Sequence, residues 1–116
     1  MRIAVDTGGG DCAPKNIVTG AVFAARQLGV GLTLVGSPDR IADELSHHEN
    51  VSDLDLRSIP AVDVVGMNEQ PVAALRRKPG ASVQVAAQTV ASGDAAAFFS
   101  AGNTGATLLA ARSAFG

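Results

Sequence analysis

Short apolar runs alternate with longer segments that carry apolar residues at helical spacing. The short runs predict buried strands at residues 2–6, 31–36 and 95–99. The longer segments predict helices at residues 14–28, 38–45, 71–78 and 83–91, and a last helix that opens at Asn103 or Thr104. Because strand and helix alternate, we expect one α/β domain over residues 1–116, built on a largely parallel sheet.

Two segments have a less regular pattern. Residues 54–60 alternate polar and apolar side chains, which favours a strand at an edge of the sheet. Residues 62–65 fit either a further short strand or a helical turn. Several helix starts are marked by their chemistry, because Pro14 suits a first helical turn and Ser37 and Ser82 are candidate N-caps.

Composition narrows the class of protein. Apolar residues make up 47% of the chain and aromatic residues 3%, and the net charge is −2. A chain with no basic stripe and almost no aromatic side chains is a poor fit to nucleic acid, so we expect none as a partner. The single cysteine, Cys12, excludes an internal disulfide, and no run has the length of a membrane span. We therefore expect a cytoplasmic protein.

The segment from Ser100 to Gly105 holds the most informative pattern. A buried strand meets a glycine loop there, and the loop opens directly into a helix. The first backbone N–H groups of a helix have no intrahelical partner and attract anions, phosphate above all. Gly102 and Gly105 permit a sharp turn and a close approach to a ligand, while Asn103 and Thr104 are both competent N-caps. The alternative is that these residues only turn the chain and cap the helix.

A second glycine loop follows the first strand. Gly8-x-Gly10-x-x-Ala13 fits the dinucleotide-binding fingerprint when read literally. Two features count against a nucleotide: Asp11 places a carboxylate inside the loop, and the next strand ends in Val35-Gly36, where a ribose-binding acid is expected. We expect neither a cofactor nor a metal, since the adjacent His47 and His48 point in different directions on a helix.

Three cations, Arg76, Arg77 and Lys78, end the predicted helix 71–78. They complement the helix dipole as solvated residues, or at most two of them reach an anion at the helix start near Ser82. Cys12 and Ser100 have no general base nearby in sequence, so a nucleophilic mechanism finds no support.

Six motifs, in this order and spacing, resemble the bacterial phosphate acyltransferase (PlsX) family of fatty acid and phospholipid synthesis. They are Met1-Arg2-Ile3-Ala4-Val5-Asp6, Gly9-Gly10-Asp11, Ala13-Pro14, Glu69-x-Pro71, Ala74-x-Arg76-x-Lys78 and Ser100-Ala101-Gly102-Asn103-Thr104-Gly105-Ala106. The resemblance covers about the first third of a family member, so we interpret the chain as the N-terminal fragment of a longer enzyme.

The resemblance implies transfer of a long acyl group from acyl carrier protein to inorganic phosphate. It also implies a three-layer α/β/α fold similar to that of phosphate acetyltransferases and the isocitrate dehydrogenase-like group, a homodimer, and possible peripheral association with a membrane. Two alternatives stay open: a phosphate acetyltransferase-like enzyme that uses a coenzyme A thioester, and a non-catalytic α/β fragment that only binds or associates.

The chemistry suggests a role for each candidate residue. Phosphate that attacks a thioester needs positioning and donors for the developing oxyanion, but no protein nucleophile. We expect Asn103, Thr104 and Lys78 to be catalytic. Substrate binding is expected from Gly9, Gly10, Asp11, Arg76, Ser82, Gly102 and Gly105, with Asp11 fixing its loop or orienting a cation.

Overall fold

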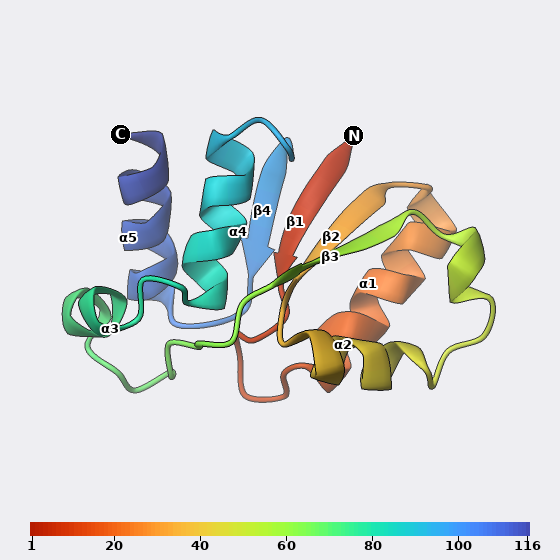
Figure 1. Cartoon of the computed structure of the whole chain (residues 1–116), viewed down its shortest axis with the longest axis horizontal. Coiled ribbons are helices and arrows are strands. Elements are labelled where there is room, and N and C mark those ends of the chain that lie inside the picture. The colour runs from red at the N-terminus through yellow and green to blue at the C-terminus, as the bar shows by residue number, and fades with distance from the viewer.

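A four-stranded, wholly parallel sheet forms the centre of the molecule in a computed structural model that describes all residues 1–116. The strands are β1 (Arg2–Asp6), β2 (Gly31–Gly36), β3 (Leu56–Pro60) and β4 (Ala97–Ser100), in the order β3-β2-β1-β4 (Figure 1). The helices are α1 (Lys15–Leu28), α2 (Pro38–Leu45), α3 (Pro71–Arg77), α4 (Ser82–Ala91) and α5 (Thr104–Phe115), with a 3-10 turn, η1, at Val51–Asp53. The α/β fold predicted from the alternating pattern is confirmed.

The two faces of the sheet are covered by different helices. On one face, Val5, Leu32 and Leu34 pack against α1 and against Ile41 of α2. On the other face, Ala4 and Val35 pack against Ala86 of α4. There α4 also packs on α5 through small side chains, which let backbones approach closely (Figure 1). Burial of this apolar surface is the main term that stabilises the fold.

The strand order places a change of direction between β1 and β4. From β1 the chain proceeds to β2 and β3 on one side, while β4 adds on the other side of β1. The helix that follows β1 lies on one face of the sheet, and the helix that follows β4 lies on the other (Figure 1). From the carboxyl ends of β1 and β4 the chain therefore proceeds to opposite faces of the sheet, and such a position is where open α/β sheets bind ligands.

Several predicted boundaries differ from the structure. β4 begins at Ala97, not at residue 95, because its pairing with β1 begins with Ile3 opposite Ala97. Helix α1 begins at Lys15, which makes Pro14 its N-cap residue. Residues 62–65 form neither a strand nor a helical turn; Asp63 makes one isolated parallel bridge to Ala81. The edge strand predicted within residues 54–60 is confirmed as β3.

Ser82 is not the N-cap of α4, and that prediction is wrong. The Ala81 carbonyl accepts the first bond of the helix, from the Val85 N–H at 3.0 Å, which places Ala81 at the cap position and Ser82 inside the first turn, buried. No helix of the molecule combines the length and the hydrophobicity needed to cross a bilayer.

Candidate anion-binding site

The loops that follow β1 and β4 touch at the carboxyl edge of the sheet. A Cβ atom on Gly9 would lie 2.9 Å from both the Gly102 nitrogen and the Ser100 Oγ, closer than Cβ atoms approach other atoms. Gly10 has a φ of 100°, in the region that favours glycine. The structure thus brings Gly9 and Gly10 of one sequence motif together with Gly102 of another. Only glycine permits this contact.

A buried carboxylate ties the two loops together. Asp6, 2% exposed, is the last residue of β1 and lies opposite Ser100 in the strand register. Its Oδ1 accepts from the Gly8 N–H at 3.0 Å, and its Oδ2 accepts from the Ser100 hydroxyl at 2.8 Å. The Ser100 Oγ in turn accepts from the Gly102 N–H at 3.1 Å. One charged side chain therefore sets the course of both loops.

Four backbone donors in the loop after β1 and at the start of α5 have no hydrogen-bond partner. The N–H groups of Gly9 and Gly10 have no hydrogen-bond partner, and neither do those of Thr104 and Gly105 in the first turn of α5. Thr104 also contributes an exposed hydroxyl to a hollow of about 320 Å³ beside Ser100 and Gly102. Free N–H groups at the positive end of a helix dipole are suited to an anion.

Of the two residues predicted as N-caps, Asn103 and Thr104, the structure has Asn103 as the N-cap of α5. Its Oδ1 accepts from the Ala106 N–H at 3.1 Å. Its amide nitrogen donates to the carbonyls of Gly66 at 3.1 Å and Glu69 at 2.9 Å, with a longer contact to Met67. Both ends of the side chain are thus occupied, so the structure gives Asn103 a positioning role, holding the connection before α3 against the start of α5.

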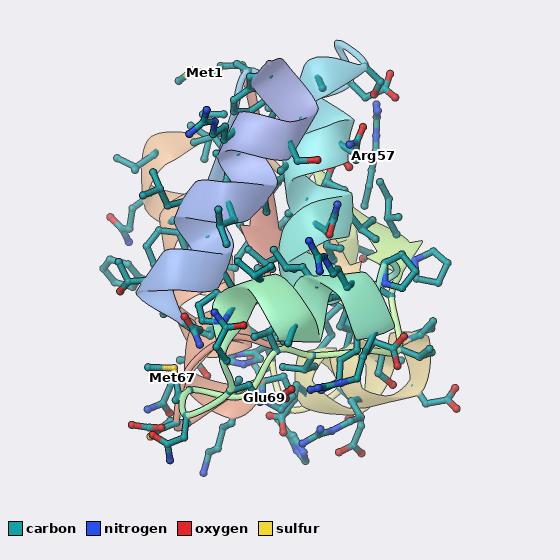
Figure 2. All side chains as sticks on the ribbon, turned by 90° about the vertical axis from the view of Figure 1, so that its left-hand side faces the viewer. Met1, Arg57, Met67 and Glu69 are labelled. Atoms are coloured by element: carbon teal, nitrogen blue, oxygen red, sulfur yellow. The ribbon has the colours of Figure 1, made fainter.

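Glu69 is the centre of an ion-pair cluster on that connection. Its Oε1 accepts from Lys78 Nζ at 2.6 Å and from the Gly66 N–H at 2.9 Å, and its Oε2 accepts from Arg77 at 2.9 Å. The hydrogen bond from Lys78, followed by those from Gly66 and Arg77, lowers the pKa of Glu69 from 4.5 to about 2. Figure 2 shows Met67 and Glu69 together at the end of the molecule opposite Met1.

Lys78 and Arg76, which the sequence suggested as cations for phosphate, lie in different surroundings. Lys78 is engaged by Glu69 and by the Val64 carbonyl at 2.8 Å, so its charge is balanced. Arg76 lines a separate hollow with Leu109 and Ser113 of α5.

Ser82 is brought near the site, because its Oγ would lie 2.8 Å from a Cβ on Gly8. Asp11 is exposed and makes no hydrogen bond, so Asp6, and not Asp11, fixes the loop after β1.

Three residues of this arrangement were missed as site candidates: Asp6, Ser100 and Glu69. A signal for the first two exists in the sequence, since each ends an apolar strand and parallel strands end at the same edge. Glu69 lies in the Glu69-x-Pro71 motif, but its ion-pair partners are eight and nine residues further along the chain and meet it only in the folded structure.

Comparison with known proteins gives matches over almost the whole chain. The family model described as fatty acid synthesis protein matches residues 1–116. A phosphate acyltransferase of Geobacter sulfurreducens is 49% identical over 95% of this chain and 32% of its own length. Phosphate acyltransferases of a Cyanothece and a Synechococcus species are 46% and 49% identical over 95% and 96% of the chain. The chain spans about a third of the length of these relatives.

Asn103→Asp keeps the acceptor oxygen of the Asn103 side chain and removes its amide donor, so it tests the two roles separately. A carboxylate still caps α5, but it no longer donates to Gly66 and Glu69 and instead repels their carbonyls. We expect a loss of about 1–3 kcal/mol in the free energy of unfolding. Hydrogen exchange should accelerate at residues 66–70 while α5 stays protected. The matched control is Gln70→Glu, because Gln70 uses only its acceptor oxygen, toward the Ala73 N–H, and should lose little. Equal effects of the two variants would contradict the assigned role.

Glu69→Gln tests the ion-pair cluster through pH. Since folding depresses the pKa of Glu69 to about 2, its stabilising effect is fully present above pH 4.5 and is lost as the pH falls toward 2. The melting temperature of the parent chain should exceed that of the variant at neutral pH, and the gap should close between pH 4.5 and 2. Glu49→Gln, at an exposed carboxylate without an ion pair, is the control. A gap that does not change with pH would overturn the prediction.

Proposed function

The chain belongs to the fatty acid synthesis protein family, and we propose that it forms the phosphate-binding part of a phosphate acyltransferase. The single observation that carries this proposal is the contact between the glycine loops after β1 and β4, in segments where the N–H groups of Gly9, Gly10, Thr104 and Gly105 have no hydrogen-bond partner. The names of the relatives support the reaction class, and the unpartnered N–H groups support an anion-binding role.

The proposed reaction needs few groups from the protein. An oxygen of hydrogen phosphate attacks the carbonyl carbon of an acyl thioester, a C–O bond forms, and the C–S bond breaks. The products are an acyl phosphate and a thiol, which takes the proton that hydrogen phosphate loses. In our proposal, the N–H groups of Gly9, Gly10, Thr104 and Gly105 hold the phosphate or the developing oxyanion, with the Thr104 hydroxyl as a further donor.

Other candidate residues have supporting roles in this proposal. Asn103 positions the start of α5, and Lys78 acts through Glu69 on the connection that Asn103 holds. The acyl carrier protein as donor and the homodimer are carried by the family resemblance, and the cytoplasmic setting by the composition of the chain.

Thr104→Pro is the sharpest test of the phosphate site. Thr104 is the first residue of α5, where proline is favoured, and Asn103 before it already has the extended backbone that precedes proline, with a ψ of 117°. The variant therefore deletes one free N–H and one hydroxyl at little cost to the helix. Phosphate at about 100 times its dissociation constant should stabilise the parent chain by about 2.7 kcal/mol. Thr104→Pro should lose most of that gain.

Two controls make the result interpretable. Thr104→Val removes the hydroxyl but keeps the N–H, so it should retain part of the stabilisation. Sodium chloride at matched ionic strength should not raise the melting temperature, because it screens charge without offering a tetrahedral anion. Stabilisation by phosphate that is equal in the parent chain and Thr104→Pro, or absent from both, would refute the site.

A further inference from the structure

The connection between β3 and α3 carries apolar side chains to the end of the sheet where the anion site is proposed. Residues 61–70 belong to no helix and no strand, and they cross the molecule at the carboxyl ends of β1 and β4 (Figure 1). Val64 and Met67 of this connection are 36% and 45% exposed. Single exposed apolar residues are common on proteins, so the position of these two, and not their exposure, decides what they can do.

Each of the two residues lies next to a segment with free backbone donors. A Cβ atom on Gly8 would lie 2.7 Å from Val64 Cγ2, so Val64 packs on the loop after β1. The Met67 carbonyl lies 3.4 Å from the amide nitrogen of Asn103, the N-cap of α5. The free N–H groups of the proposed anion site belong to that same loop and to the first turn of α5. One exposed apolar residue therefore flanks each half of the site.

Polar contacts hold the backbone of both residues in place. Lys78 Nζ donates to the Val64 carbonyl at 2.8 Å. The Asn103 amide donates to the carbonyl of Gly66, directly before Met67, at 3.1 Å. The connection is thereby fixed through its backbone while the side chains of Val64 and Met67 stay partly open to solvent. Such an arrangement presents apolar surface to a ligand at a defined place.

We propose that Val64 and Met67 form a subsite for the alkyl chain of the acyl group, beside the donors for phosphate. This inference rests on the proposed function and deepens it. An acyl phosphate combines an anion with an alkyl chain, and the two residues place apolar surface next to anion donors. Removal of methylene groups from water by apolar side chains is favourable. The subsite therefore selects longer acyl groups over acetyl.

The test uses octyl phosphate and ethyl phosphate, which join a phosphate group to a long and to a short alkyl chain. The protein has two methionines, Met1 and Met67, at opposite ends of the molecule (Figure 2). In protein with ¹³C-labelled methionine methyl groups, octyl phosphate below its micelle concentration should shift the Met67 signal and leave the Met1 signal in place. Octyl phosphate should also bind at least about tenfold more tightly than ethyl phosphate.

Two variants and a matched control locate the subsite. Val64→Thr and Met67→Gln keep the size of the side chain and make it polar. Each should reduce the preference for octyl over ethyl phosphate by about threefold or more, while inorganic phosphate binds as in the parent chain. Val72→Thr is the control, since Val72 is 42% exposed but lines the separate hollow that contains Arg76. It should leave the preference unchanged.

Inorganic phosphate separates this proposal from the proposed function. If inorganic and ethyl phosphate bind but octyl phosphate binds no more tightly, or if all three variants behave alike, the subsite is refuted and the phosphate site stands. If neither inorganic nor ethyl phosphate binds, the proposed function fails and the subsite fails with it.

Two further outcomes would refute the subsite by identifying another contact. Equal shifts of the Met1 and Met67 signals would indicate detergent-like contact with the whole surface. Self-association of the chain that Met67→Gln abolishes, without a preference for octyl phosphate, would identify a second copy of the chain as the occupant.

Discussion

The arrangement of the candidate site depends on the buried carboxylate of Asp6. A charge with 2% exposure is costly unless it is hydrogen-bonded, and Asp6 meets this cost with the Gly8 N–H and the Ser100 hydroxyl. These two partners belong to the loops after β1 and β4, so the need to satisfy one carboxylate holds both loops together. At this contact the N–H groups of Gly9 and Gly10 have no hydrogen-bond partner.

A second layer of polar contacts extends this order to the connection before α3. Asn103 caps α5 and at the same time holds the carbonyls of Gly66 and Glu69. The Glu69 carboxylate accepts hydrogen bonds from the Gly66 N–H and from Lys78. An irregular segment that would otherwise be free is thereby fixed to the start of the helix where the anion is proposed to bind. Asn103 and Lys78, which the sequence suggested as catalytic residues, both take part in these contacts.

Much of the fold could be predicted from the sequence, because hydrophobic periodicity reports burial directly. The parallel sheet, the edge position of β3 and the Asn103 cap follow from local patterns. The site was harder to predict, since its key contacts join distant segments: Asp6 and Ser100 are 94 positions apart, and Asn103 reaches 34 to 37 residues back. Ser82 was misassigned as a cap because the first bond of α4 is accepted one residue earlier, by the Ala81 carbonyl, while the Ser82 N–H bonds to the distant Asp63 carbonyl.

The most direct test of the central claim is a titration of the ¹⁵N-labelled chain with inorganic phosphate, followed by amide chemical shifts. The account predicts that the largest shifts occur at Gly9, Gly10, Thr104 and Gly105, with one common dissociation constant. Because these amides belong to two loops far apart in sequence, a joint response would show that they form one site. Shifts confined to one loop, or located at the cations of α3, would contradict the account.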